Sequence, residues 1–194
     1  MNNVKDLQTI EETLKYLQFD NWEQSAPGLA RSRELLGLLG NPEQKLKFVH
    51  IAGTNGKGST AAMLASVLRR AGYRTGLYTS PHLLRFHERM RVNGEEIDDN
   101  SLISLTNTVR NAAENMSEMP TGFEIMTAIA CQAVYDARDL AKTADIAAAM
   151  TCQALHGIRK AFDPKVHALR GQPGQITAAE NLRRLLEGSR LSFA

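Results

Sequence analysis

The stretch between Phe48 and Ala71 constrains the fold more strongly than any other part of the chain. A short apolar run, Phe48–Ala52, precedes a glycine-rich loop, and a run rich in small residues, Ala61–Ala71, follows it. The loop consists of Gly53, Thr54, Asn55, Gly56, Lys57, Gly58, Ser59 and Thr60. A strand, a glycine-rich loop with a lysine and then a helix is the order of a phosphate-binding loop, where backbone N–H groups and a helix N-terminus face an anion. We therefore expect this glycine loop, residues 53–60, to bind nucleotide phosphates, with Lys57 reaching the outer two.

The spacing of the glycine loop departs from the common G-x-x-x-x-G-K-[ST] pattern. Only two residues separate Gly53 from Gly56, and Gly58 stands between Lys57 and Ser59. The alternative is an ordinary strand-to-helix turn that happens to contain a lysine. The density of glycine, hydroxyl and amide residues in so short a stretch favours the phosphate-binding interpretation.

Length, charge and cysteine content narrow the remaining possibilities. The chain has 194 residues and 43% hydrophobic residues, which is enough for one domain, or a domain plus an appendage, with a buried core. The net charge of +2 gives no reason to expect a nucleic acid or a membrane as a partner. Cys131 and Cys152 lie in apolar, helix-like contexts, so we expect them to pack as small hydrophobic residues. These features predict a cytoplasmic protein in a reducing compartment.

Periodicity predicts a protein of the α/β class. Helical spacing of apolar residues predicts helices near residues 4–18 and over 29–39, 98–113 and 122–137. Asp98 or Asp99 is the expected cap of the third of these. Arg74–Tyr78 is an expected strand, which would pair in parallel with Phe48–Ala52 through the helix between them. Because ligands of such sheets bind beyond the carboxyl ends of the strands, the loop after Tyr78 and the glycine loop should face one crevice.

Four motifs in order resemble the folylpolyglutamate synthase/dihydrofolate synthase family of the Mur ligase superfamily. They are Gly53–Thr60, Thr79–Leu83, Arg85–Gly94 and Phe123-Glu124 with the Thr127-Ala128 pair that follows. The resemblance covers about residues 1–137, and it implies a truncated, P-loop-containing, parallel-sheet ATPase domain. For the charged run Arg85–Arg89, the residues alone do not decide between two alternatives, a solvated face and a loop that faces the substrate.

The resemblance also implies a reaction and a set of site residues. ATP would phosphorylate a carboxylate of folate or a dihydropteroate-type precursor, and the amino group of glutamate would displace the phosphate. Lys57 would be the catalytic residue at the ATP phosphates, and Ser80 and Glu124 would be Mg²⁺ ligands. The folate side of the site would be formed by Thr79, Ser80, Pro81, His82 and Leu83. If the family resemblance is set aside, Ser80 is expected to be an ordinary turn residue before a proline. Glu124 is then expected to be a glutamate that the helix dipole favours in the first turn of a helix.

Residues 138–194 resemble a different family. The segment from Leu140 to Ser189, including Ala161-Phe162-Asp163-Pro164, is similar to an interior part of histidine ammonia-lyase, an aromatic amino acid lyase. The chain is therefore interpreted as a chimera joined near residues 138–146, with an all-helical second part. The lyases need an electrophile made from Ala-Ser-Gly, and this sequence contains no such tripeptide. His156 and His167 are expected to be surface or packing residues.

An amphipathic face in the second part is expected either to fold back onto the first domain or to drive self-association. Its residues recur at helical spacing and are Ile176, Ala179, Leu182, Leu185 and Leu186. Three functions follow from the two resemblances: a folate ligase by descent with little activity of its own, a non-catalytic ATP-binding module, and a helical association segment without lyase chemistry. The ligase interpretation lacks two family features in this sequence, namely a third, histidine ligand for Mg²⁺ and a domain that binds glutamate.

Overall fold

The computed structural model describes residues 5–18 and 28–192. The chain divides into two compact units. The first unit contains residues up to 66 together with 75–136, and the second unit contains 67–74 together with 137–194. Among the described residues, no helix combines the length and the apolar character needed to cross a membrane.

Three helices of the first unit lie close to where the sequence predicts them. These are α1 (Ile10–Leu17), α2 (Ala30–Leu38) and α4 (Asp99–Ala113). α1 begins later than expected because Thr9 caps it: the Thr9 hydroxyl accepts from the Glu12 N–H, and the Glu12 carboxylate accepts from the Thr9 N–H. Asp98 caps α4 by accepting from the Ser101 N–H at 2.9 Å, as one of the two expected capping residues.

The sheet of the first unit is small and antiparallel. Its strands are β1 (Gly76–Tyr78), β2 (Met90–Val92) and β3 (Glu95–Glu96), in that order. Leu77 pairs with Arg91, and Arg91 pairs with Glu96 on its other side. Asn93 and Gly94 both have positive φ, 53° and 91°, which is the conformation of a tight hairpin turn. A short 3₁₀ helix, η3 (Phe86–Arg89), leads into β2.

The prediction of a parallel sheet is wrong for the described residues. Phe48–Ala52 forms no strand, and the side chains of Phe48 and Val49 are 62% and 69% exposed. β1 instead pairs with β2, which lies about a dozen residues further along the chain. A short connection costs less closure entropy than the long crossover that parallel pairing requires, and parallel strands also need cover on both faces.

Two helices differ from their predicted bounds. α3 (Lys57–Arg70) begins within the glycine loop, four residues before the expected start, and it buries none of its residues. α5 (Gly122–Ala154) starts where predicted but does not end at Ala137. No glycine or proline interrupts residues 123–156, and alanine is frequent there, so the helix continues through the expected junction at 138–146.

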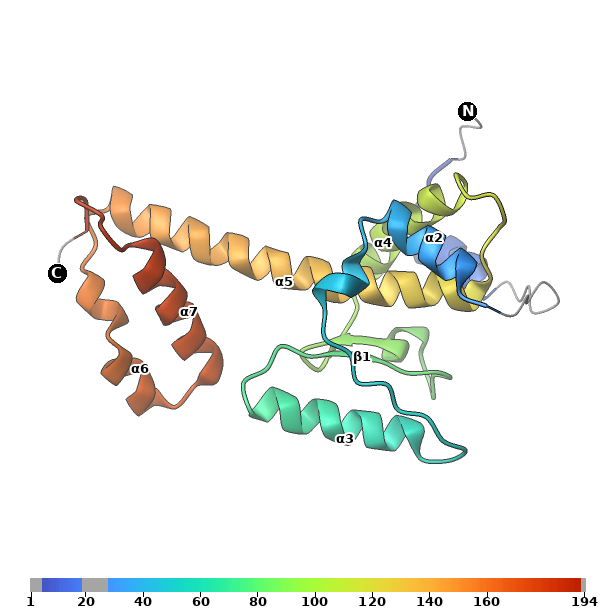
Figure 1. Cartoon of the computed structure of the whole chain (residues 1–194), viewed down its shortest axis with the longest axis horizontal. Helices are drawn as coiled ribbons and strands as arrows, with labels where there is room; N and C mark the ends of the chain where they lie inside the picture. Colours follow the sequence, from blue (N-terminus) through green and yellow to red (C-terminus); the bar gives the residue numbers. More distant parts are fainter. Residues whose placement is uncertain (1–4, 19–27, 193–194) are drawn as a thin grey trace. The chain divides into compact units, whose positions relative to one another are not determined.

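The core of the first unit lies where α1, α2 and η3 meet α4 and the first half of α5 (Figure 1). Its most deeply buried side chains are Leu17, Leu35, Leu102, Val109 and Ile129. Cys131 of α5 is also buried. This core fixes the start of α5 and the η3–β2 segment, which carry much of the candidate site.

The second unit is helical, as the sequence predicts. After α5 come a 3₁₀ helix, η4 (Arg159–Phe162), then α6 (Pro164–Arg170) and α7 (Pro173–Leu185), which pack against one another (Figure 1). Ala179 and Leu186 are buried, so part of the predicted amphipathic face packs inside this unit. His167 is buried with Nε2 3.1 Å from the Ala161 carbonyl oxygen, and His156 is exposed, in agreement with packing and surface roles.

Candidate functional site

The glycine loop passes directly into the N-terminus of α3. Gly53 and Gly56 have φ values of 151° and 75°, which residues with a Cβ rarely adopt. The Gly56 carbonyl oxygen accepts from the Thr60 N–H at 2.9 Å, which closes the first turn of the helix. The N–H groups that precede Thr60 therefore have no partner inside the helix and are available to an anion. Residues 52–60 are all exposed.

Lys57 folds back over the glycine loop. Its Nζ donates to the carbonyl oxygen of Gly53 at 2.5 Å and to that of Thr54 at 2.9 Å. The ammonium thus lies on the loop itself, beside the start of α3. Helix N–H groups, two hydroxyls and a lysine ammonium together form an arrangement that favours a phosphate group.

A second cluster surrounds Ser80. The guanidinium of Arg89 donates through Nε to His82 Nδ1 at 2.9 Å and through Nη1 to Ser80 Oγ at 3.4 Å. The Thr79 N–H also donates to the Arg89 carbonyl oxygen at 3.0 Å. Arg89 therefore holds residues 79–83, the Ser80 loop. Sequence reasoning did not identify Arg89 as a site residue, because it stood out only as part of the charged run Arg85–Arg89. Its position shortly after the Ser80 loop was the only feature of the sequence that pointed to this role.

The carboxylate of Glu88 holds the end of the Ser80 loop. It accepts from the N–H groups of Leu83 at 2.9 Å, Arg85 at 3.0 Å and Leu84 at 3.1 Å. These bonds, with the one from Leu83 foremost, hold the pKa of Glu88 below its ordinary value. Leu83 and Leu84 are left 91% and 88% exposed, so the charged run fixes a loop that presents apolar side chains to solvent.

Glu124, in the first turn of α5, is surrounded by donors. One oxygen accepts from the Thr121 N–H at 2.8 Å and the Thr121 hydroxyl at 2.9 Å, and the other accepts from the Ser32 hydroxyl at 3.1 Å. Arg31 Nε lies 3.3 Å from the same oxygen that Thr121 contacts. Partial burial works to raise the pKa of this carboxyl. The bonds from Thr121 and Ser32 and the charge of Arg31 outweigh it, so the pKa is lowered.

The structure brings the Ser80 loop and the start of α5 together. Arg89 Nη1 lies 3.5 Å from the sulfur of Met126, and the rings of Tyr78 and Phe123 are 6.4 Å apart. Arg89 thus links Ser80 to the helical turn that follows Glu124. Within the described ranges, no hydrogen bond or ion pair joins the glycine loop to Ser80 or to Glu124.

The oxygen donors of Ser80 and Glu124 are the types that Mg²⁺ prefers. Both are already engaged, Ser80 by Arg89 and Glu124 by Arg31, Ser32 and Thr121. In the part of the chain that the structure describes, no three His, Cys, Asp or Glu side chains are grouped as a metal site. The oxygen atoms of Ser80 and Glu124 are therefore of the type that binds a hard cation. A bound cation would replace Arg89 and Arg31 as the partners of these oxygens.

Comparison with known proteins shows two separate likenesses. A dihydrofolate synthase/folylpolyglutamate synthase of Bacillus subtilis (strain 168) is 46% identical over 108 residues, which are 54% of this chain and 25% of the relative. A folylpolyglutamate synthase of Lacticaseibacillus casei is 39% identical over 129 residues, covering 61% of this chain and 29% of the relative. The first likeness is therefore to the folate ligases.

Solved structures agree with the first likeness. A folylpolyglutamate synthase from Thermotoga maritima superposes with a TM-score of 0.61 at 38% identity, covering 66% of this chain and 31% of that one. A bifunctional folylpolyglutamate synthase/dihydrofolate synthase from Yersinia pestis CO92, complexed with AMPPNP and a Mn ion, gives 0.62 at 31% identity, covering 70% and 33%. The chain spans a quarter to a third of the length of these folate ligases.

The second likeness is to lyases. The family model for aromatic amino acid lyase matches residues 104–193. A histidine ammonia-lyase of Alkaliphilus oremlandii (strain OhILAs) is 57% identical over 68 residues, which are 35% of this chain and 13% of that protein. The match begins well before residue 140, where the sequence motifs placed it, so the lyase-like segment includes part of α4 as well as α5.

Proposed function

We propose that the chain binds ATP through the glycine loop and that residues 1–137 are the ATP-binding part of a folate–glutamate ligase. One observation carries this proposal: α3 opens directly from the glycine loop, with the Lys57 ammonium lying over that loop. Two further facts support it. A relative with a folate ligase name is 46% identical over 108 residues, and similar structures were solved with AMPPNP and a Mn ion or with ADP.

Each predicted site residue has a role in the proposal. The N–H groups and hydroxyls of residues 56–60 would contact the ATP phosphates, and Lys57 would neutralise the outer ones. Ser80 and Glu124 would hold Mg²⁺, which supplies charge neutralisation at the phosphates. The Ser80 loop would face the pterin-bearing substrate, and a similar structure contains a ligand abbreviated DHPP together with ADP.

The proposed reaction is the joining of glutamate to a carboxylate that ATP has activated. Positioning and charge neutralisation would supply most of the catalysis, since a carboxylate is a poor electrophile until it is phosphorylated. We propose that this chain alone turns over little, because no histidine of residues 138–194 has a metal-site neighbourhood among the described residues. The same proposal places the chain in the cytoplasm.

Calorimetry of ATP with Mg²⁺ tests the proposal directly. The intact chain should bind saturably, and Lys57→Ala should weaken binding roughly tenfold or more, because a charge-assisted bond is worth about 1.5–3 kcal/mol. Lys47→Ala is the matched control, since it removes an exposed lysine of the same segment outside the loop. A folded sample, judged by circular dichroism, that shows no binding, or equal loss in both variants, overturns the proposal.

A second candidate function rests on the lyase-like match to residues 104–193. We propose that the second unit serves association through its helices and carries no lyase chemistry, because this sequence lacks Ala-Ser-Gly. Exposed apolar side chains of the second unit, including Leu155, Ile158 and Leu169, are consistent with it. Formation of urocanate from histidine, followed by absorbance, would contradict the absence of lyase chemistry, and sedimentation would report association.

A further inference from the structure

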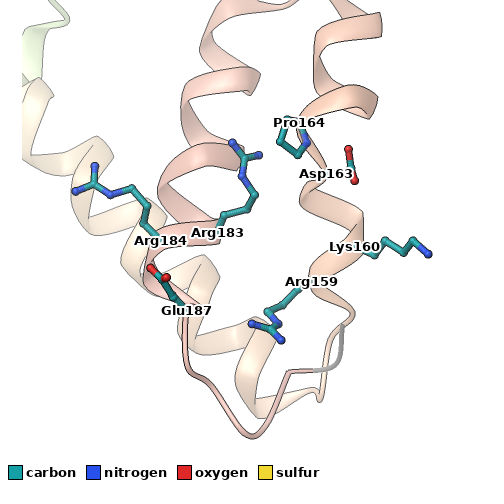
Figure 2. Close-up of a pocket in the computed structure, with 7 residues that line it drawn as sticks. All are labelled: Arg159, Lys160, Asp163, Pro164, Arg183, Arg184 and Glu187. Atoms are coloured by element: carbon teal, nitrogen blue, oxygen red, sulfur yellow. The ribbon is translucent and has the colours of Figure 1, made fainter.

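The depression between η4, the start of α6 and the end of α7 is open to solvent and provides no enclosed ligand site (Figure 2). Arg159 and Arg183 line it, and Figure 2 shows their side chains pointing apart. The Arg183 guanidinium already donates to the carbonyl oxygen of Phe162, and Arg159 Nε is closed to solvent. A better-defined arrangement of polar groups lies in the first unit, around Arg89.

Arg89 is fixed by contacts along its whole length, just before strand β2 begins at Met90. Its carbonyl oxygen accepts from the Thr79 N–H at 3.0 Å. Its guanidinium packs over the ring of Phe86, with Cζ 5.3 Å from the ring centroid, and Nη1 lies 3.5 Å from the sulfur of Met126. Phe86 and Met90 are buried in the core. The guanidinium is therefore held on the core of the first unit.

His82 accepts a hydrogen bond from this fixed guanidinium. Arg89 Nε lies 2.9 Å from His82 Nδ1. An arginine side chain is always protonated in proteins and has no acceptor, so Nδ1 must supply the lone pair. A neutral imidazole carries its proton on only one ring nitrogen, which places the proton of His82 on Nε2. The His82 ring also packs against Phe86, with centroids 5.9 Å apart and planes tilted by 54°, which restrains its orientation.

The Nε2–H group of His82 is left as a free donor. Within residues 5–18 and 28–192 it has no hydrogen-bond partner, and it does not belong to the buried polar atoms that lack one, so solvent reaches it. Leu83, the next residue in the chain, is 91% exposed. An N–H donor of fixed direction and a neighbouring exposed apolar side chain suit a ligand that has an acceptor atom on an apolar ring system.

We infer that Arg89 is a positioning residue, which fixes His82 in the tautomer with its proton on Nε2, and that this N–H donates to an acceptor of the pterin-bearing substrate. The identity of the substrate rests on the proposed function, whereas the tautomer does not. Arg89 acts through His82 and needs no contact of its own with the substrate. Its Nη1 also lies 3.4 Å from Ser80 Oγ, so one guanidinium orders two polar side chains of the Ser80 loop.

Nitrogen-15 NMR of the ligand-free chain tests the tautomer. At about pH 8.5, above the ordinary histidine pKa of about 6.5, Nδ1 and Nε2 of His82 should give the widely separated signals of a single tautomer with the proton on Nε2. His82→Gln identifies these signals by removing them. Arg89→Met should move the two signals toward each other, because both tautomers are then populated. Arg91→Met is the matched control, since the Arg91 guanidinium pairs with Glu96, and it should leave the signals in place.

Folic acid is the probe for the donor role of His82. Added to the unmodified chain, it should shift the Nε2 signal, and the shift should be smaller in Arg89→Met. Averaged signals or a proton on Nδ1 in the unmodified chain overturn the positioning role, and this measurement does not require Arg89→Met to fold. Unchanged signals in a folded Arg89→Met also overturn it.

An Nε2 signal that folic acid leaves in place overturns the donor role. Neither measurement involves ATP or the glycine loop. Calorimetry with ATP therefore succeeds or fails separately, and the failure of the proposed ATP binding is distinguishable from the failure of this inference.

Discussion

Arg31 on α2 and Glu124 on the first turn of α5 form an ion pair, with Arg31 Nε 3.3 Å from Glu124 Oε2. Both side chains are mostly buried, with 12% and 11% of their surface exposed. Ser32, the next residue of α2, donates to the other oxygen of the same carboxylate. The pair fastens α2 to the start of α5 and occupies the carboxylate that the family resemblance assigns to Mg²⁺.

Removing Arg31 should destabilise the first unit. Arg31→Gln leaves a largely buried carboxylate without its charged partner, which should lower the free energy of unfolding by about 1–3 kcal/mol. Urea denaturation followed by circular dichroism measures the loss. Arg33→Gln, an exposed arginine on the same helix, should change stability little. Equal midpoints for the two variants would show that the pair contributes nothing.

The same substitution should strengthen binding of a divalent cation. If Arg31 and a metal ion compete for Glu124, Arg31→Gln should bind Mn²⁺ several-fold more tightly than the unmodified chain, as measured by electron paramagnetic resonance of free Mn²⁺. Glu124→Gln should remove the effect in the Arg31→Gln background. Unchanged affinity in Arg31→Gln would show that the two do not compete.

Glu124 should make stability depend on pH in the acidic range. Its pKa is lower in the folded chain than its ordinary value of 4.5, so the stabilisation is fully present above that value and is lost as the pH falls through the folded pKa. Glu124→Gln should therefore show a shallower loss of stability than the unmodified chain between about pH 5 and pH 3. Glu11→Gln, an exposed glutamate of α1, controls for net charge. Parallel pH profiles for the unmodified chain and Glu124→Gln would contradict the prediction.

Gly76→Ala should destabilise the contact between β1 and α5. An added Cβ would meet Val134 Cγ2 at 2.2 Å, and the branched valine has little freedom to move. We expect a loss of about 1–3 kcal/mol, partly restored by Val134→Ala in the double variant. Gly37→Ala in α2 is the matched control: nothing lies within 4 Å of its added Cβ, so it should stabilise the helix by about 0.5–1 kcal/mol. Thermal melts of these three variants and of the unmodified chain would decide between these expectations.

Cys131 should react slowly with thiol reagents in the folded chain. Burial raises the pKa of its thiol to about 11, so only about one molecule in a thousand is a thiolate at pH 8. In a Cys152→Ala background, Ellman's reagent should modify the folded chain on the order of a hundred times more slowly than glutathione. The same sample in urea should react fully. Rapid modification without urea would show that this face of α5 opens readily.

Short-range features of the fold were predictable from the sequence. The capping of α4 by Asp98, the turn at Asn93-Gly94, and the break after α2 at Gly40-Asn41-Pro42 all depend on a few neighbouring residues. The glycine loop was proposed as a phosphate-binding loop for the same reason, because such a loop is a local backbone motif that ends in a helix N-terminus. Its contact with phosphate stays a prediction. The long-range consequence drawn from it, a parallel strand pair, was wrong.

The sequence by itself determined where most of the helices lie, that Asp98 caps α4 and which two families the chain resembles. Only the tertiary structure decided the pairing of β1 with β2, the continuation of α5 through residues 138–146, and the partners of Glu124. Ser32 and Glu124 are 92 positions apart, and no periodicity or motif reports such a contact. Local hydrogen bonds and capping act within a few residues, whereas pairings between distant residues depend on which surfaces bury together.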